Sequence, residues 1–156
     1  MRPYDLNYLR KAIHVASQAR EHGNHPFGAV LVDEQGQFVL EAENIVVTGG
    51  DCTGHAETNL IRKASAALSP KALAGCTLYT STEPCAMCSG AIFWSGVGRV
   101  VYALSERGLL EIAAHLPNSN FLNLPCREVF ARGGRAVEVS GPLLEEEARQ
   151  VHLGFW

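Results

Sequence analysis

Apolar residues near the start of the chain recur every three or four positions, which is the spacing of one face of a helix. The recurring positions are Leu6, Leu9, Ile13 and Ala16. Asp5 stands just before this pattern as an expected N-cap, and Gly23 stands just after it as a stop signal. The pattern therefore predicts an amphipathic helix from Asp5 to Gly23.

Two short apolar runs follow at residues 27–32 and 38–42, and residues 33–36 between them have the composition of a turn. This order predicts a β-hairpin. In the second strand, the period-two alternation of side chains places four residues on one face. They are Phe38, Leu40, Ala42 and Asn44. Asn44 is therefore expected to end an otherwise apolar row with an amide.

Helical and strand patterns alternate along the rest of the chain, except in residues 115–134, which we expect to be irregular because they contain Pro117 and Pro125. Helices are predicted over residues 55–68, 86–94, 105–114 and 143–153. Strands are predicted over residues 76–80, 98–103 and 135–139. Such alternation is typical of an α/β fold. We expect one domain, residues 1–156, with three α/β/α layers and a mixed five-stranded sheet.

The composition is that of a soluble globular protein, with 47% hydrophobic and 19% charged residues. No apolar run approaches the roughly 18 residues of a membrane span, and no secretory signal precedes the first helix. We therefore expect a cytoplasmic protein without a membrane partner. The net charge is −3, and no basic run is longer than two residues. Nucleic acid is thus not expected as a partner, because phosphate binding depends on clustered lysine and arginine.

Two short motifs carry the chemistry of the chain: His55-Ala56-Glu57 and Pro84-Cys85-Ala86-Met87-Cys88. One imidazole and two thiolates are three protein ligands for Zn²⁺, which leave the fourth tetrahedral position open for water. An open position is typical of a catalytic rather than a structural zinc site. Glu57 adds a carboxylate that can move protons. We predict one Zn²⁺ per chain, bound by His55, Cys85 and Cys88, with Glu57 as the catalytic residue.

The spacing within each motif constrains where the ion can lie. Cys85 and Cys88 are three residues apart, so one helical turn can present both thiolates, and Pro84 suits the first turn of that helix. His55 and Glu57 would point about 200 degrees apart on a regular helix. We therefore expect His55 before a helix and Glu57 in its first turn. The zinc is then predicted to lie between the N-termini of the second and third predicted helices.

The remaining cysteines and histidines receive simpler interpretations. Buried, non-ligating thiols are expected at Cys52, Cys76 and Cys126, although Cys52 is close enough to His55 in the sequence to be a neighbour of the zinc pocket. Surface positions are expected for His14, His115 and His152. His25, in the loop before Phe27, is a candidate for the pocket lining.

The two motifs together resemble those of the zinc-dependent nucleobase and nucleoside deaminases, a superfamily that includes cytidine and deoxycytidylate deaminases. The resemblance covers roughly residues 5–105, including the segments 26–29 and 98–102 and Asn44. It implies the zinc ligands and the proton shuttle named above, and a reaction in which water replaces an amino group and ammonia leaves. It also implies a small-molecule substrate and a homodimer.

Residues outside the zinc motifs most resemble bacterial guanine deaminases. By this resemblance Phe27 and Trp94 would clamp a flat base, and Asn44, Ala56 and His25 would also contact the substrate. Core packing is the alternative for Phe27 and Trp94, and a turn at the end of a strand is the alternative for Asn44.

The same resemblance leaves one contact unfilled. Guanine-type enzymes bind the amidine edge of the base with an aspartate after the fourth strand, whereas residues 117–120 here are Pro-Asn-Ser-Asn. Glu111 is the candidate substitute. The C-terminal residues Phe155 and Trp156 are expected either to cover the sheet or to form a pocket lid or dimer contact.

Three alternatives to a deaminase of a guanine-like base remain. Transfer-RNA adenosine deaminases share the zinc motif, but their last helix is typically basic, whereas this one contains Glu145, Glu146 and Glu147. Fungal-type cytosine deaminases use the same ligands in a smaller pocket. A non-catalytic scaffold is the third, which Glu57 argues against. We expect a hydrolytic deaminase of a free nucleobase or related aminated heterocycle, with a guanine-like purine favoured.

Overall fold

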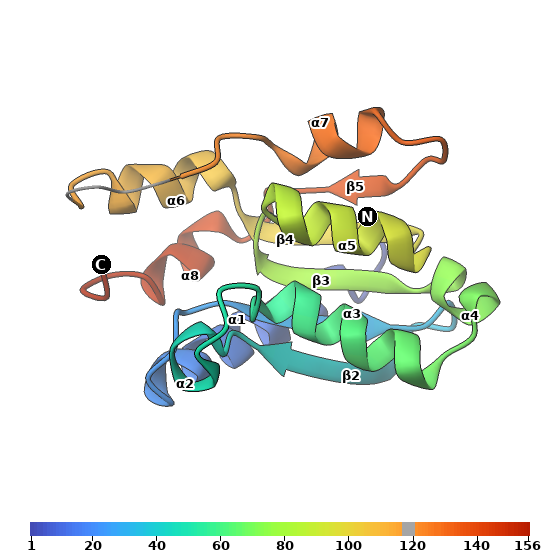
Figure 1. Ribbon diagram of the computed structural model, residues 1–156, viewed down its shortest axis with the longest axis horizontal. Coiled ribbons are helices and arrows are strands. Elements are labelled where there is room, and N and C mark those ends of the chain that lie inside the picture. The colour runs from blue at the N-terminus through green and yellow to red at the C-terminus, as the bar shows by residue number, and fades with distance from the viewer. Residues whose placement is uncertain (117–120) are drawn as a thin grey trace.

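The protein is described by a computed structural model over residues 1–116 and 121–156, and one mixed sheet forms its centre (Figure 1). The strands are β1 (Gly28–Val32), β2 (Phe38–Glu43), β3 (Thr77–Thr82), β4 (Arg99–Leu104) and β5 (Glu138–Ser140). They lie in the order β2-β1-β3-β4-β5. β1 is antiparallel to β2 and β3, whereas β4 is parallel to β3 and β5. The predicted hairpin and the mixed five-stranded sheet are therefore confirmed.

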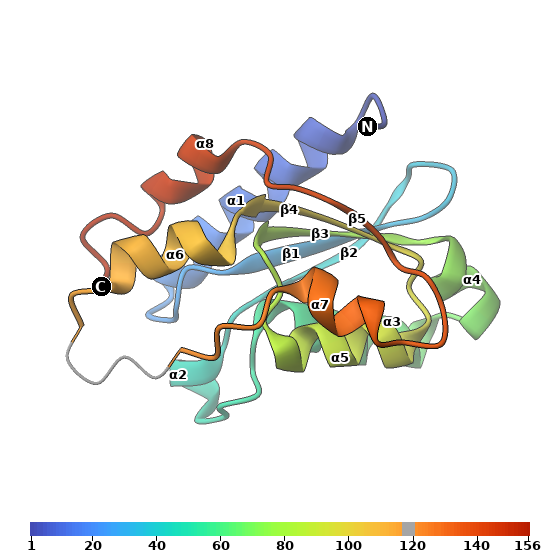
Figure 2. The same ribbon diagram turned by 90° about the horizontal axis from the view of Figure 1, so that it is seen from above.

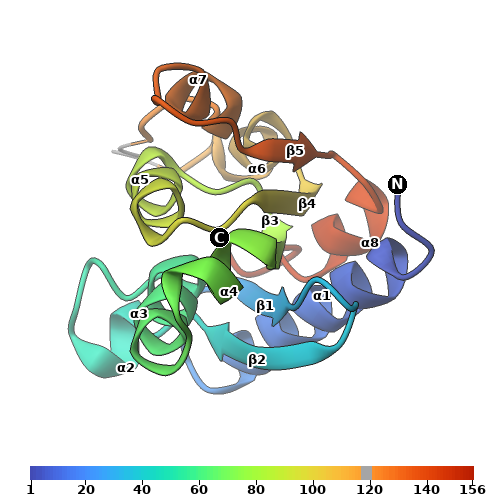
Figure 3. The same cartoon turned by 90° about the vertical axis from the view of Figure 1, so that its right-hand side faces the viewer.

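Helices cover both faces of this sheet. The longer ones are α1 (Asp5–Glu21), α3 (Ala56–Ala67), α5 (Ala86–Ser95) and α6 (Glu106–Ala113), and the C-terminal one is α8 (Glu145–Gln150). α1 and α8 pack on one face, and α3 and α5 lie on the other (Figures 2 and 3). The three-layer prediction is confirmed. None of the described helices combines the length and the apolar character that a membrane crossing requires.

Three short helices were not predicted: α2 (Val46–Gly49), α4 (Pro70–Gly75) and α7 (Cys126–Ala131). Each has at most two turns, which is too short to show a hydrophobic period. α7 packs beside α5 and lies within residues 115–134, so the expectation that this whole segment is irregular was wrong. α8 is also shorter than the predicted helix over 143–153, because turns replace it after Gln150.

Every residue of β1 is buried, which explains its uninterrupted apolar sequence. Ala29 and Leu31 belong to the core beneath α3 and α5, whereas Val30 and Val32 belong to the core beneath α1. The strand therefore separates the two hydrophobic cores. Because Phe27 immediately precedes β1, this rigid strand also fixes one wall of the site described below.

The predicted apolar row on β2 is wrong for Phe38. The pairing of β2 with β1 contains an irregularity at Val39, so Phe38 is shifted by one residue relative to Leu40. A one-residue shift moves a side chain to the opposite face of a sheet. Leu40 and Ala42 join the core beneath α3, whereas Phe38 is 46% exposed and lies under the ammonium of Lys11 on the α1 side.

Asp5 does not cap α1, as the sequence had suggested, but is the first residue of that helix and is fully buried. Its carboxylate accepts two hydrogen bonds from the guanidinium of Arg99 on β4, both 2.8 Å, and one of 2.7 Å from the hydroxyl of Tyr79 on β3. Burial opposes ionisation, but the hydrogen bonds from Arg99 and Tyr79 outweigh it and lower the pKa of Asp5 to about 2. Asp5 therefore ties α1 to the sheet.

Candidate metal centre and adjoining pocket

The three predicted zinc ligands come together at the start of two helices. His55 is the N-cap of α3, Cys85 is the N-cap of α5, and Cys88 lies in the first turn of α5. The His55 Nδ1 atom is 3.6 Å from the Cys85 sulfur and 3.5 Å from the Cys88 sulfur. Zinc ligands at their usual bond lengths stand roughly 3.5 Å apart in a tetrahedron. The arrangement therefore fits Zn²⁺ and confirms its predicted place between two helix N-termini.

Pro84 was expected in the first turn of α5, but it precedes the N-cap of that helix. Because Cys85 is the N-cap, Pro84 lies outside α5, where its carbonyl oxygen accepts a hydrogen bond of 3.2 Å from the Ser89 hydroxyl. This bond joins the segment that precedes α5 to the first turns of the helix. Pro84 therefore fixes the direction from which Cys85 enters the metal centre.

The charges of the ligands favour metal binding. A hydrogen bond with Cys88, followed by one with His55, lowers the pKa of Cys85 to about 4. The thiolate is the form of cysteine that binds a metal. The pKa of Cys88 is raised by its hydrogen bond with Cys85 and by burial, so Cys88 keeps its proton beside the Cys85 thiolate. Metal binding at this site would release that proton.

Glu57 lies in the first turn of α3, as the spacing predicted, and is only 5% exposed. The Thr80 hydroxyl donates a hydrogen bond of 2.6 Å to its Oε1 atom, and the Cys88 thiol donates one of 3.4 Å to Oε2. Burial raises the pKa of Glu57, although the hydrogen bond from Thr80 opposes the shift. The centre thus combines three metal ligands with a buried carboxyl group whose proton affinity is increased.

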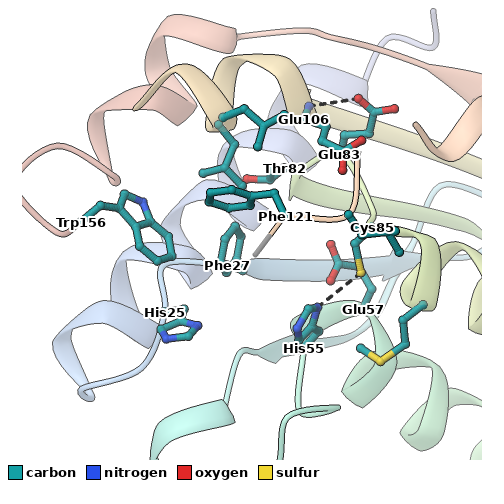
Figure 4. A pocket seen from close by; sticks show the side chains of 14 residues that line it. His25, Phe27, His55, Glu57, Thr82, Glu83, Cys85, Glu106, Phe121 and Trp156 are labelled. Carbon is teal, nitrogen blue, oxygen red and sulfur yellow. Dashed lines mark hydrogen bonds between the residues drawn. The ribbon is translucent and has the colours of Figure 1, made fainter. Parts of the chain in front are cut away.

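A cavity of about 410 Å³ opens beside this centre. His55, Glu57 and Cys85 form one side of it, and the opposite side consists of His25, Phe27 and Trp156, which we call the aromatic wall (Figure 4). Apolar residues close the remainder: Met87, Leu109, Leu110, Phe121 and Leu122. A flat ring can therefore lie between the metal centre and the aromatic wall. On α6 the sequence had suggested Glu111 as a substrate contact, whereas the residues of this helix that line the cavity are Glu106, Leu109 and Leu110.

Two predicted pocket residues, His25 and Phe27, do line the cavity. The ring centroids of Phe27 and Trp156 are 6.2 Å apart, and those of His25 and Trp156 are 5.5 Å apart. Phe27 also packs against the core beneath α3, so the core-packing alternative is confirmed, and its contact with a base stays a prediction. Burial, followed by the nearby His55, lowers the pKa of His25 and favours its neutral form.

Trp94 is a predicted pocket residue that lies away from the cavity of its own chain. Its side chain is 84% exposed and contributes neither to the cavity nor to the core. α5 begins at the metal centre and points away from it, so Trp94 lies about 13 Å from Cys85 along the helix axis, at 1.5 Å per residue. The same helix that presents the ligands therefore carries Trp94 out of reach.

Asn44 is buried at the end of β2, and its Oδ1 atom accepts a hydrogen bond of 3.0 Å from the Val46 N–H. The turn interpretation is thus confirmed. Its Nδ2 atom is also buried and has no hydrogen-bond partner among the described residues. Ala56 is the fully buried first residue of α3. Neither residue lines the cavity, so their contacts with a substrate stay predictions.

Glu111 does not supply the missing carboxylate. It lies on the outer side of α6, 3.4 Å from Arg107 and 3.5 Å from Arg149, and it does not line the cavity. The reason is helical geometry, since the pocket side of α6 is taken by Glu106, Leu109 and Leu110. Residues 117–120, whose sequence lacks a carboxylate, lie outside the described part of the chain.

Besides Glu57, the described carboxylates that line the cavity are Glu83 and Glu106, beyond Cys85 (Figure 4). Glu83 accepts hydrogen bonds from the N–H groups of Glu106 and Cys126, at 3.0 and 3.1 Å. The Oε2 atom of Glu106 is buried and has no partner among the described residues. Burial, followed by the neighbouring Glu83, raises the pKa of Glu106. This pair could not be predicted from the sequence, because neither residue belongs to a motif.

Three of the simpler predictions can also be compared with the structure. Cys76 and Cys126 are buried, as expected, whereas Cys52 is exposed and lies outside the ligand set. His152 was expected to be a surface or helix-face residue, and it is fully buried after the end of α8. It follows α8 in a segment that turns back toward Phe27, and this return could not be read from the helical pattern.

Three comparisons with known proteins agree with this geometry. Residues 3–104 match the family described as the cytidine and deoxycytidylate deaminase zinc-binding region. A probable cytosine deaminase of Schizosaccharomyces pombe is 46% identical over 97% of this chain and 92% of its own length. A guanine deaminase of Bacillus subtilis is 44% identical, but over 67% of each protein. A solved transfer-RNA deaminase of the wobble position has a TM-score of 0.75 at 29% identity, covering 94% of this chain and 99% of that one.

Proposed function

This chain belongs to the zinc-binding family of cytidine and deoxycytidylate deaminases, and we propose that it removes the amino group of a free aminopyrimidine base, with cytosine as the first candidate. The observation that carries this choice is the 46% identity to a probable cytosine deaminase over 97% of the chain. That similarity extends beyond residue 104 and includes Glu106, which lines the cavity. The similarity to guanine deaminase covers only 67% of the chain.

The residues around the metal centre define how the reaction would proceed. When bound, Zn²⁺ supplies a Lewis acid that makes water a nucleophile near neutral pH. Glu57 would take the two protons of that water one after the other, and would deliver the first to the ring nitrogen and the second to the departing amine. The Thr80 hydroxyl holds the Glu57 carboxylate in one orientation through its 2.6 Å hydrogen bond. The raised pKa of Glu57 helps it keep a proton between these two transfers.

The unpartnered polar atoms near the cavity support a free base rather than a nucleoside. A free pyrimidine carries an N–H donor next to a carbonyl acceptor, whereas a nucleoside has a sugar on that nitrogen. The Oε2 atom of Glu106, which is buried at the cavity, can accept such an N–H. The buried Nδ2 atom of Asn44 also lacks a partner among the described residues, but Asn44 does not line the cavity, so a contact between this amide and the carbonyl is part of the proposal. Buried polar groups are normally paired, so each of these atoms is suited to a ligand partner.

Guanine is the second candidate, because a guanine deaminase is 44% identical over two thirds of the chain. A cavity of about 410 Å³ accommodates either a single or a fused ring, so its size does not separate the two bases. The decisive property is the pattern of donors and acceptors that the base presents to Glu106. This proposal therefore places cytosine before guanine, the reverse of the order that the sequence motifs favoured.

Transfer RNA is a weaker candidate substrate. The chain has a net charge of −3, and its last helix begins with Glu145, Glu146 and Glu147. Like charges would repel the phosphates of an anticodon stem. A non-catalytic scaffold is also disfavoured. Glu57 is buried with its carboxylate against the metal ligands, and a structural zinc site does not need a residue that carries protons.

We also propose that the enzyme is a homodimer, with the exposed side of α5 at the interface. Met87 and Trp94 are seven residues apart and thus share a helix face, and they are 38% and 84% exposed. Exposed apolar side chains on one face are typical of an interaction surface. Light scattering of the purified protein would measure the mass, and a monomer at micromolar concentration would contradict the proposal.

One experiment tests the proposed reaction. The zinc-loaded enzyme is incubated with cytosine, guanine, adenine, cytidine, guanosine and transfer RNA, and released ammonia is measured together with the loss of the aminated substrate. We expect the highest kcat/KM with cytosine and a value at least about tenfold lower with cytidine. Preference for guanine would replace the first candidate by the second. Turnover of transfer RNA alone would overturn the assignment to free bases.

A further inference from the structure

The segment after α8 is fixed to α1 by its backbone. The Arg20 guanidinium donates hydrogen bonds of 2.8 Å to the carbonyl oxygens of Val151 and Leu153. His152 lies between these two residues and points the opposite way, into the protein, where it is fully buried. The two bonds from Arg20 therefore hold the backbone, and they leave the His152 side chain free to form contacts inside the molecule.

His152 is hydrogen-bonded to the aromatic wall. The Trp156 indole N–H donates to the His152 Nδ1 atom at 3.1 Å, and the two rings are nearly parallel, with an angle of 10° and centroids 6.2 Å apart. An indole nitrogen can only donate, so Nδ1 must be unprotonated. The proton of the neutral imidazole is then on Nε2, which faces the Thr82 hydroxyl oxygen at 3.5 Å.

The same imidazole packs against a second part of the wall. The ring centroids of His152 and Phe27 are 5.3 Å apart. Phe27, Thr82 and Trp156 all line the cavity, but His152 does not. His152 therefore contacts three lining residues without facing the cavity itself, and any effect it has on a bound base must act through them.

We propose that His152 is a positioning residue, whose neutral imidazole accepts the Trp156 N–H and holds Trp156 and Phe27 in the orientation that faces the metal centre. The proposal rests on the proposed function in one respect, namely that this cavity receives the base. Without the Nδ1 acceptor, the indole N–H would lose its partner and could rotate outward to bond with water. The base would then bind to an incomplete wall, whereas Glu57 and the zinc ligands would be unaffected.

The position of the indole can be measured without any substrate. The chain contains two tryptophans. The change Trp94→Phe, at the exposed end of α5, therefore leaves Trp156 as the only tryptophan fluorophore. In that background, His152→Leu removes the acceptor, and His152→Asn places an amide oxygen near the position of Nδ1. His14→Leu, on an exposed position of α1, is the matched control.

We expect His152→Leu to shift the Trp156 emission to longer wavelength and to increase its quenching by iodide at least twofold. The emission with His152→Asn and with His14→Leu should stay near that of the parent. Circular dichroism would establish that each variant is folded. Unchanged emission and quenching in folded His152→Leu would overturn the proposal.

Kinetics with the base that the enzyme turns over fastest provide the second readout. A neutral hydrogen bond contributes on the order of 1 kcal/mol, so His152→Leu should raise KM about fivefold and change kcat less than twofold. Asn at 152 should recover most of the loss. A fall in kcat at constant KM would contradict positioning. If the parent deaminates no base, the proposed function fails, and the fluorescence still decides the role of His152.

A second variant protects the test against misfolding of His152→Leu. Trp156→Phe keeps an aromatic ring in the wall, although a smaller one, removes the N–H donor and leaves the buried imidazole in place. KM should rise as with His152→Leu, and the double variant should show no further rise, because both changes break the same bond. Additive increases in KM would mean that the two residues act independently and would overturn the proposal.

Discussion

The metal centre and the aromatic wall face each other across one cavity, but they are built in different ways. His55, Glu57, Cys85 and Cys88 occupy two short motifs, each at the start of a helix. The wall joins residues from opposite ends of the chain, since Phe27 precedes β1 and Trp156 follows α8. Local backbone geometry therefore determines the chemistry, whereas long-range packing determines which molecule is presented to it.

The strongest test of this division is Glu57→Gln on the metal side. The amide keeps the shape of the side chain and cannot carry a proton, so kcat should fall by about 10³-fold, which is the scale of general acid and base catalysis. Zinc content by atomic absorption and KM should stay near the parent values. Thr80→Val, which removes the hydrogen bond to Glu57, is the matched variant and should cost less. Undiminished turnover in Glu57→Gln would refute the mechanism.

The second prediction concerns how the stability of the protein depends on pH through His152, behind the aromatic wall. Burial, followed by the cations of Arg20 and Arg149, lowers the pKa of His152 from 6.5 to about 4. Between these values the unfolded chain binds a proton that the folded chain does not, so the free energy of unfolding falls as the pH drops from 6.5 to 4. The loss attributable to this residue is about 3 kcal/mol.

Urea unfolding at several pH values would measure that slope, and His152→Asn is the variant that should flatten it. Asp5 provides a control within the same protein, because its pKa of about 2 places its own contribution to acid unfolding below this window. Equal slopes in the parent and in His152→Asn would contradict the buried neutral imidazole.

These two sides also differ in how well they could be predicted from sequence. The two-residue spacing of His55 and Glu57 is compatible with few backbone paths, so a helix entry could be inferred without coordinates. His152 illustrates the opposite case. A histidine near the end of an amphipathic helix has the same sequence context whether it faces water or the interior, and only the return of the segment toward Phe27 decides between them.

The errors in the fold have the same origin. The register shift at Val39 that turns Phe38 to the other face depends on the pairing of two strands, which no pattern within β2 encodes. Asp5 resembled an N-cap because its partners, Arg99 and Tyr79, are more than seventy residues away in the sequence. By contrast, the distance of Trp94 from the metal centre could have been predicted from the sequence, because the rise of the helix alone separates Trp94 from Cys85.

The third prediction tests recognition of the base by Glu106, which lines the cavity beyond Cys85, through Glu106→Gln. Hydrogen bonds to charged groups contribute about 1.5–3 kcal/mol, so KM for cytosine should rise at least about tenfold, with kcat nearly unchanged. The advantage of cytosine over cytidine should shrink by the same factor, because the sugar replaces the N–H that Glu106 is proposed to bind. Glu111→Gln, on the outer side of α6, is the control and should leave both constants unchanged.

The smallest effect is expected for Trp94→Ser, although the sequence had placed Trp94 in the pocket. Trp94 is 84% exposed at the far end of α5. Zinc content and kcat/KM should therefore change less than twofold, when they are measured at a protein concentration high enough to keep the proposed dimer assembled. If the exposed side of α5 forms the dimer interface, the variant should instead dissociate at higher protein concentration, because removal of a large apolar side chain weakens such contacts. Sedimentation measures this directly, and Lys63→Ser, on an exposed position of α3, is a control. A large loss of activity in a dimeric Trp94→Ser variant would mean that Trp94 contacts the substrate after all, and the separation between the metal centre and the wall would have to be redrawn.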